Sequence, residues 1–280
     1  MKYINKLIDA AMIFVLLSGT VAMAGDSKNV ELIKKFDAAW NAHDLEGALA
    51  FYHDDAVVIT PDGNTLRGKE EIAGWEKSLL AGFHVESTGF REEGSLVSWD
   101  FTVHSDFFAG MGVNPVKGTG TAEIVKGKIK SFKPAFDQET TGKLVVSQFF
   151  QMYDGGVDFN EMGEKILAPG FMAHFPGQPA MDVEGYKQLG AMFRAGFSGM
   201  KHTLESLIAE GEWVAARGTV TASHSGEFQG VPASGKPVKL TFVTFDRVVD
   251  GKLAERYVEL DALGLMMQIG GIPAPQQVSR

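Results

Sequence analysis

The hydrophobic pattern of the chain changes from helical to strand spacing once in each half. In residues 30–41, apolar side chains recur at helical spacing, and residues 44–51 continue as a second, short helix. A β-branched run at 56–60 predicts a strand, and residues 70–80 predict a third helix. Further strands are expected as far as Asp137.

The second half shows the same order of elements. Helices are predicted at 144–153 and 158–167, a strand at 171–175 and a third helix at 183–197. Four long strands follow from His202. Helices followed by a run of strands indicate an α+β fold in each half.

Matching residues at similar spacing support a duplication. His104-Ser105 stands 120 residues before His224-Ser225, and Asp137 stands 124 residues before Asp261. A period of this length is too long for a solenoid repeat and fits a whole domain copied in tandem.

The duplication predicts two domains with short flanking segments. We expect one domain at 29–137 and its copy at 144–270, with a polar linker at 138–143 and a C-terminal tail at 271–280. Because the linker is short, the two domains should pack together as an intramolecular pseudo-dimer. Each should be a cone, in which about three helices cover a curved antiparallel sheet and leave a pocket at the wide end.

The first residues, 1–24, are predicted to be a signal peptide. A basic start, an apolar run at 10–17 and the small residues Ala22 and Ala24 match such a segment and its cleavage site. The alternative is a membrane anchor, but the apolar run is too short to span a bilayer and is interrupted by Ser18. We therefore expect an exported protein, periplasmic or extracellular, without membrane attachment after cleavage.

Composition excludes several partners and chemistries. The formal net charge is -9, which argues against nucleic acid or an anionic membrane as a partner. The chain has no cysteine, so it has no disulfide, no thiolate nucleophile and no thiolate metal site. Hydrophobic residues are 45% and charged residues 22%, as in an ordinary soluble globular protein.

Two stretches of the second half resemble a known family. Residues 222–238 (ASHSGEFQGVPASGKPV) and 248–270 (VVDGKLAERYVELDALGLMMQIG) resemble the SnoaL-like polyketide cyclase and ester cyclase family, within the nuclear transport factor 2-like fold. The pattern is a glycine-spaced His turn, then Asp-Gly-Lys, then an Asp nine residues after that Lys. Residues 38–63 resemble the broader SnoaL-like group. Two tandem cones are therefore expected, the first of them degenerate.

The resemblance implies a pocket protein without a cofactor and assigns the acid/base position to Asp261. In the family, such a carboxylate removes an activated carbon proton beside a carbonyl group, and the enolate then closes a ring. Isomerisation or hydrolysis of a small apolar carbonyl compound would use the same group. The alternative is a solvated Asp at a strand end, because its strand face also carries Glu255 and Glu259.

His224 is the second catalytic candidate. It ends a row of apolar residues at every second position, starting from Val214, and this row should point inward. The alternative is a hydrogen-bonded structural histidine in the core.

Five further residues are predicted to contact a substrate. His174 and His202 should lie at the pocket mouth, where either could donate a hydrogen bond to an enolate oxygen. Tyr257, Phe242 and Trp213 complete the predicted contacts.

The first domain has partial equivalents of these residues in Asp137, His104 and His84. Its His strand is three residues shorter, and His104 lies on the strand face opposite Trp99. We therefore expect the first domain to be the poorer catalyst. No metal site is predicted, because the histidines lack convergent acidic partners.

Three functions remain open for such a chain. It could be an acid/base enzyme, a non-catalytic protein that binds a small hydrophobic molecule, or a structural tandem module. Burial of Asp261 beside His224 would favour the enzyme, whereas a solvent-exposed Asp261 would favour the other two.

Overall fold

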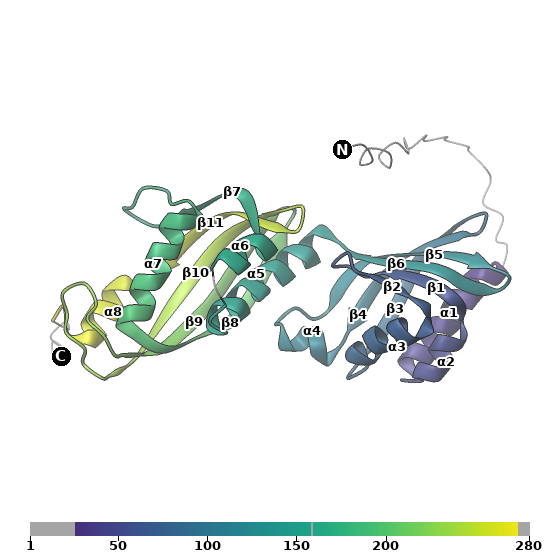
Figure 1. Ribbon diagram of the computed structural model, residues 1–280, viewed down its shortest axis with the longest axis horizontal. Helices are drawn as coiled ribbons and strands as arrows, with labels where there is room; N and C mark the ends of the chain where they lie inside the picture. The colour runs from purple at the N-terminus through teal and green to yellow at the C-terminus, as the bar shows by residue number, and fades with distance from the viewer. Residues whose placement is uncertain (1–25, 158, 274–280) are drawn as a thin grey trace, which may run out of the picture.

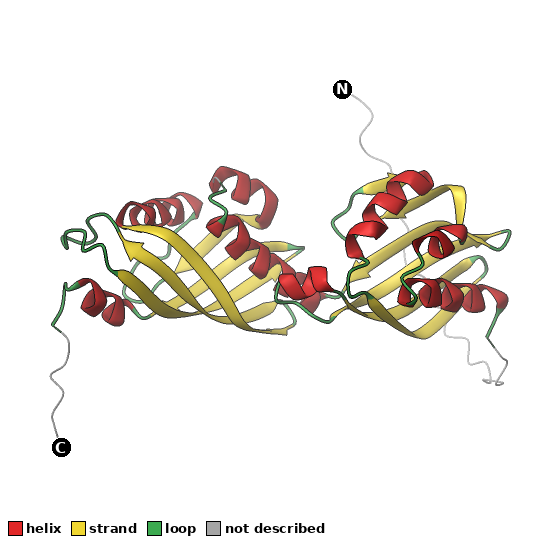
Figure 2. Cartoon of the chain, turned by 90° about the horizontal axis from the view of Figure 1, so that it is seen from below, coloured by secondary structure: helices red, strands yellow, loops and turns green. Residues whose placement is uncertain are grey.

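The structure, a computed structural model, describes residues 26–157 and 159–273. The predicted signal peptide and most of the predicted C-terminal tail lie outside these residues. Figure 1 shows two α+β units arranged end to end, and Figure 2 shows that helices cover one face of each sheet. No described helix is long and apolar enough to cross a membrane.

The first domain begins with the helices that the periodicity predicts. They are α1 (Lys28–Asn41), α2 (Leu45–Ala50) and α3 (Gly68–Leu79), and a short helix, α4 (Asp106–Gly110), follows later. The Ser27 side chain caps α1 and the Asp44 side chain caps α2, each by accepting a backbone N–H. The apolar face of α1 is buried in the first core.

The first sheet has six strands in the order β2-β1-β6-β5-β4-β3. Their bounds are β1 (Tyr52–Ile59), β2 (Thr65–Arg67), β3 (His84–Glu93), β4 (Leu96–His104), β5 (Val116–Val125) and β6 (Lys128–Phe136). Strands β3 to β6 pair antiparallel, whereas β1 pairs parallel with β6. The sheet is therefore mixed, not purely antiparallel as expected.

The second domain repeats this plan. Its helices are α5 (Gln138–Asp154), α6 (Phe159–Ile166), α7 (Val183–Gly196) and α8 (Ala262–Ile269). Its five strands have the order β7-β11-β10-β9-β8, again with one parallel pair, β7 and β11. Their bounds are β7 (Leu167–His174), β8 (Phe197–Glu210), β9 (Trp213–His224), β10 (Pro237–Val249) and β11 (Lys252–Leu260).

The predicted linker at 138–143 is the first part of the 17-residue helix α5. Asp137 caps α5 by accepting the Thr140 N–H at 2.7 Å, and Asp261 caps α8 by accepting the Gly264 N–H at 2.8 Å. The start of α5 thus corresponds to α8, and its remainder corresponds to α1. The polar composition of 138–143 fits a capped helix start as well as a loop, which explains the wrong expectation.

The two domains meet near α5, and their sheets do not face each other (Figure 1). Gln138 donates a hydrogen bond from Nε2 to the Val248 carbonyl, and the Ser147 hydroxyl donates one to the Met111 carbonyl. Leu207 packs against both cores. The expected pseudo-symmetric dimer is therefore not the arrangement of the described residues, because a continuous helix joins the domains end to end.

Strand register defines which residues of the two domains correspond. Gly118 pairs with Phe136 in the first sheet, and Phe242 pairs with Leu260 in the second, at a spacing of 124 residues. Across the next strand, Phe101 pairs with Gly118 and Gly218 pairs with Phe242, so here the spacing is 117 residues. The same fold is thus repeated, but with a different spacing in each segment.

The register corrects two predicted equivalents. At a spacing of 117 residues, His104 corresponds to Thr221, not His224, and His202 corresponds to Val85, not His84. Asn41 confirms the second match, since its Oδ1 accepts the Val85 N–H just as Asp154 Oδ2 accepts the His202 N–H. The difference arises because β9 is longer than β4.

Candidate ligand-binding site

The first domain contains a cavity of about 1060 Å³ that extends to residues of the second domain. This volume lies just above the usual range of about 300–1,000 Å³ for small-molecule sites. Aromatic side chains from the helices and the sheet form much of its wall: Phe36, Trp40, Trp75, Phe83, Trp99, Phe101, Phe107, Phe108, Phe132 and Phe136. The cavity therefore lies in the domain for which the sequence predicted the poorer site.

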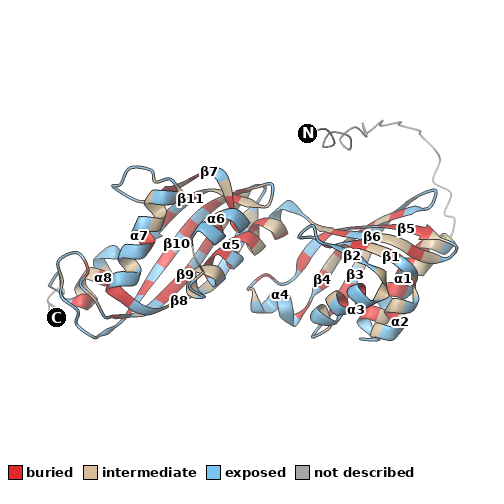
Figure 3. Ribbon diagram, viewed as in Figure 1, coloured by how far each residue is buried: buried red, intermediate tan, exposed pale blue. Residues whose placement is uncertain are grey.

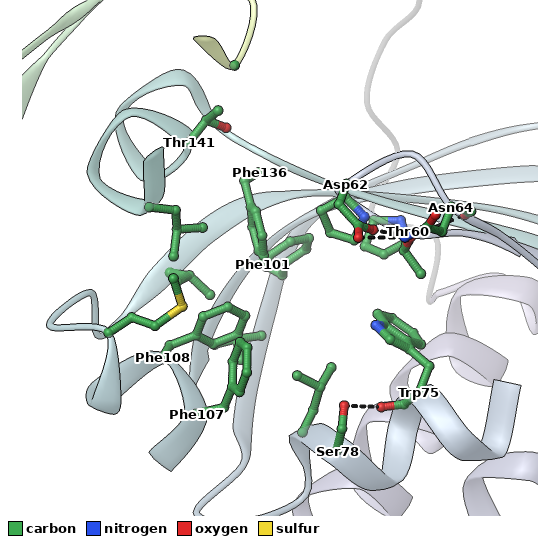
Figure 4. A pocket seen from close by; sticks show the side chains of 18 of the residues that line it. Thr60, Asp62, Asn64, Trp75, Ser78, Phe101, Phe107, Phe108, Phe136 and Thr141 are labelled. Carbon is green, nitrogen blue, oxygen red and sulfur yellow. Dashed lines mark hydrogen bonds between the residues drawn. The ribbon is translucent and has the colours of Figure 1, made fainter. Parts of the chain in front are cut away.

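Strand alternation builds the sheet side of this cavity. Val97, Trp99, Phe101 and Val103 are the buried residues of β4, and the last three of them line the cavity. In Figure 4, Phe107 and Phe108 of α4 face Trp75 and Ser78 of α3 across the open space.

The second domain completes one side of the cavity. Thr141, Leu144 and Val145 of α5 line it, as does the β10–β11 turn at 250–252. Gly142 packs against Val214 and Val248 at this junction, so α5 lies close to the second sheet. The cavity is thus formed by the tandem chain and not by the first domain alone.

Few polar groups line the cavity. Thr60, Asp62 and Asn64 form a hydrogen-bonded group at one rim, which Figure 4 shows. Asp37 of α1 is half-buried, and burial raises its pKa to about 6, with the nearby Ser87 hydroxyl opposing the shift. The Ser87 hydroxyl is buried, and the two groups fall outside normal hydrogen-bond geometry. Asp37 was not among the residues singled out from the sequence.

A second buried acid, Glu76 of α3, lies behind the cavity wall. Burial raises the pKa of Glu76 to about 8, with the hydroxyl of Tyr52 opposing the shift, and neither group reaches normal hydrogen-bond geometry with another described residue. The Tyr52 ring contacts Phe36, whose own side chain lines the cavity. Glu76 and Tyr52 therefore form a buried polar pair beside the site.

The second cone differs in its interior. Asp246 and Arg256, paired across β10 and β11, are completely buried and form a two-pronged ion pair at 2.6 and 3.1 Å. The Arg256 guanidinium also lies 3.8 Å from the centroid of the Phe149 ring. At the corresponding pair of positions the first domain has Ala122 and Phe132. Charged side chains thus occupy positions in the second cone that are apolar in the first.

His224 is buried, as its alternating row predicts. Its Nδ1 is 3.0 Å from the Ser234 hydroxyl, and its ring packs on Phe197. Its Nε2 is buried and without a hydrogen-bond partner among the described residues. These contacts hold the loop after β9 to the core.

Asp261 is solvent-exposed, and its carboxylate caps α8. None of the contacts of the described residues brings it to His224. The structure therefore does not bring together the two catalytic candidates from the sequence, because the closing segment after β11 is a helix whose first N–H groups need a cap.

Three of the predicted substrate contacts lie on the outer face of the second sheet. The His174 ring stacks on Tyr257 with centroids 4.3 Å apart, and His174 Nε2 is 3.0 Å from a Glu255 carboxylate oxygen. The Trp213 ring stacks on Phe245, which is 46% exposed. His174, Tyr257 and Trp213 thus lie away from the interior that the helices cover, because periodicity groups residues on one face but does not say which face the helices cover.

His202 and Phe242 do face the interior of the second cone. His202 Nδ1 is 2.5 Å from Asp154 Oδ1, and its ring lies 5.6 Å from that of Phe242. Burial lowers the pKa of His202, and the hydrogen bond that its ring shares with the accepting Asp154 carboxylate opposes the shift.

The first-domain candidates are not at the cavity. Asp137 caps α5, while His84 and His104 are exposed and pair with each other across β3 and β4. No group of three or more His, Asp or Glu side chains in the described residues is arranged to hold a metal ion.

Sequence comparisons agree with a duplicated chain. The model of the SnoaL-like polyketide cyclase family matches residues 144–269, and the model of a SnoaL-like domain matches residues 33–132. No curated protein sequence matches the chain significantly.

Many solved structures resemble part of the chain. AclR, a candidate hydroxylase from Streptomyces galilaeus, is 25% identical over 49% of this chain and 85% of its own, with a TM-score of 0.45. A candidate SnoaL-like polyketide cyclase from Jannaschia sp. CCS1 is 26% identical over 48% of this chain and 94% of its own, with a TM-score of 0.45. IdmH, a candidate polyketide cyclase from Streptomyces antibioticus, is 26% identical over 46% of this chain and 98% of its own, with a TM-score of 0.42.

Each of these neighbours spans about half of the chain, the length of one domain. The two family models together cover most of the sequence, one in each half. The chain therefore belongs to the SnoaL-like proteins and consists of two such domains in tandem.

Proposed function

We propose that this protein binds a small, largely apolar molecule in the cavity of its first domain. The observation that carries the proposal is the size of that cavity and its aromatic lining. It corresponds to the binding-protein alternative of the sequence analysis, with the ligand in the first cone and the second domain as part of its wall.

The buried Asp246–Arg256 ion pair supports assigning the ligand to the first cone. At the positions of this ion pair the first domain has Ala122 and Phe132. The interior of the first cone therefore lacks these two charges and offers an apolar surface that an apolar ligand can cover. The solvent-exposed position of Asp261 also favours binding over chemistry at that residue.

The test uses the neutral fluorescent probe N-phenyl-1-naphthylamine and the full chain. Val103 lines the cavity, and Val220 is its counterpart in the second cone; each is 8% exposed. Val103→Phe should weaken probe binding by tenfold or more, about 1.4 kcal/mol, because the ring occupies ligand space. Val220→Phe should leave probe affinity unchanged, although both variants carry a similar overpacking cost of about 1–3 kcal/mol.

Two results would overturn the proposal. One is the absence of probe binding to the unaltered chain. The other is a loss of binding in Val220→Phe with none in Val103→Phe, which would place the ligand in the second cone. Circular dichroism of both variants shows that each is folded.

A second candidate function is acid/base catalysis at Asp261, as the match of 144–269 to the polyketide cyclase family suggests. Its substrate would be a small carbonyl compound, and its test is turnover of a panel of poly-β-carbonyl esters. Asp261→Asn keeps the helix cap but removes basicity, so it should lower turnover by roughly 10²- to 10⁴-fold, whereas Asp137→Asn should change it little. An unchanged rate in Asp261→Asn would eliminate this candidate.

We also propose that the protein is exported, from the sequence of residues 1–24. N-terminal sequencing of the mature protein should begin at Gly25. Recovery of an intact Met1 in the membrane fraction would contradict export by cleavage.

A further inference from the structure

Asp37 is a carboxyl group without a cation in an otherwise mostly apolar cavity wall. No Lys, Arg or His side chain among the described residues forms an ion pair with it. Lys34, one turn earlier on α1, pairs with Asp26 instead. Burial raises the pKa of Asp37 to about 6, so the carboxylate is the main form at neutral pH.

The Asp37 carboxyl shares the cavity lining with aromatic rings. Phe36 and Trp40 are near Asp37 in the sequence of α1, and both line the cavity. Ser87, whose hydroxyl opposes the rise in the pKa of Asp37, pairs across the sheet with Phe101, another lining residue. A negative carboxylate beside π-rich walls is a combination that attracts organic cations, which interact favourably with both.

The second cone lacks both polar groups. Asn41 and Asp154 make the same backbone contact to β3 and β8, so Asp37 corresponds to Phe150, and the strand register matches Ser87 to Leu204. Phe150 is buried in the second core and Leu204 packs against it. The Asp37 carboxyl and the Ser87 hydroxyl therefore occur in the first cone, which has the cavity. In the second cone, which has the buried ion pair, apolar side chains replace both groups.

We infer that the first-domain cavity recognises an organic ammonium ion, a protonated amine on an apolar body, through the Asp37 carboxylate. The inference rests on the proposed binding function of this cavity and specifies its ligand class. The ammonium supplies the cation that Asp37 lacks, while the apolar body covers the aromatic wall. An uncharged ligand of equal size would leave the carboxylate buried and unpaired, which is unfavourable.

The experiment compares two probes of nearly equal shape by isothermal titration calorimetry on the full chain at neutral pH. These are 2-(1-naphthyl)ethylamine, which is cationic, and 2-(1-naphthyl)ethanol, which is neutral. The amine should bind at least about tenfold more tightly than the alcohol, as expected for a partly buried charge-assisted hydrogen bond. In Asp37→Asn the preference should fall to about one, with the affinity for the alcohol retained.

Glu86→Gln is the matched control. It removes a carboxylate from the same domain, but the Glu86 side chain is 70% exposed and does not line the cavity, so the amine preference should persist in this variant. Asp37→Leu removes the same charge by a different side chain, which covers the case in which Asp37→Asn is not folded.

The outcomes separate the inference from the proposed function. Equal affinity for the two probes in the unaltered chain overturns the inference, even when N-phenyl-1-naphthylamine binds. An amine preference that survives both Asp37 substitutions also overturns it. If neither naphthyl probe nor N-phenyl-1-naphthylamine binds, the proposed function itself fails.

Discussion

Single residues decide what each cone can hold. An aromatic ring covers a glycine on the neighbouring strand in both sheets, but Phe101 covers Gly118 in the first, whereas Phe242 covers Gly218 in the second. A side chain at either glycine would collide with the ring that covers it. A phenylalanine on one strand therefore requires a glycine on the neighbouring strand, and the two domains place this pair in opposite order. The two copies thus keep the same fold with differently shaped interiors.

Asp37 shows what the sequence could and could not reveal at this scale. On an amphipathic helix such as α1, Asp37 is expected on the polar face, so the sequence of this helix alone does not mark it as a site residue. Comparison with Phe150 in the second copy was the available signal. The cavity behind it depends on packing between distant segments, which hydrophobic periodicity does not encode.

Glu76 predicts a pH dependence of stability. Its pKa is about 8 in the folded protein and 4.5 in the unfolded chain, so between these values the folded state holds one more proton. Stability must therefore fall as pH rises through this window, by about 1.4 kcal/mol per pH unit from this group. Glu76→Gln cannot ionise and should remove that part of the slope.

Urea unfolding of both proteins at pH 5, 6, 7 and 8 measures this difference. As pH rises, the free energy of unfolding of the unaltered chain should fall more steeply than that of Glu76→Gln, so the difference between the two proteins should shift in favour of the variant. Glu86→Gln is the control, since the Glu86 side chain is 70% exposed, and it should leave the slope unchanged. Parallel curves for Glu76→Gln and the unaltered chain would show that Glu76 is ionised when folded.

At the scale of elements, the closing segment of each domain is a capped helix. Asp137 and Asp261 both follow the last strand of their sheets and accept an N–H from the residue three positions on. The duplicated Asp thus has a structural role in both copies, independent of any catalytic one.

The cap predicts different effects for two substitutions of Asp261. Asp261→Ala should lower the free energy of unfolding by about 0.5–2 kcal/mol, because the Gly264 N–H loses its partner. Asp261→Asn should change it little, since Asn is nearly as good a cap. Equal losses in the two variants, measured by urea unfolding, would argue that charge and not capping stabilises α8.

Element types were largely predictable, whereas their ends and exposed faces were not. The alternating row of β9 correctly predicted that His224 is buried, and that of β4 correctly predicted that His104 lies on the face opposite Trp99. The joining of the linker to α5, the parallel strand pairs and the outward direction of His174 and Tyr257 depend on tertiary packing. Sequence spacing also misaligned His104 with His224, because strands of unequal length break a constant offset.

At the scale of the whole molecule, the tandem arrangement builds one site from two domains. Helix α5 belongs to both, since its start closes the first domain and its remainder packs in the second. Thr141 and Leu144 on this helix reach the cavity, as does the turn at 250–252. The second domain therefore contributes to the site even though the aromatic lining comes from the first.

The central claim is that the ligand occupies the first cone, and the four tryptophans of the chain test it directly. Trp40, Trp75 and Trp99 line the cavity, whereas Trp213 lies on the outer face of the second sheet. In ¹⁹F NMR of the 5-fluorotryptophan-labelled full chain, N-phenyl-1-naphthylamine should shift the resonances of Trp40, Trp75 and Trp99 and leave that of Trp213 unchanged. A shift of Trp213 alone, or no shift of any resonance, would contradict the account.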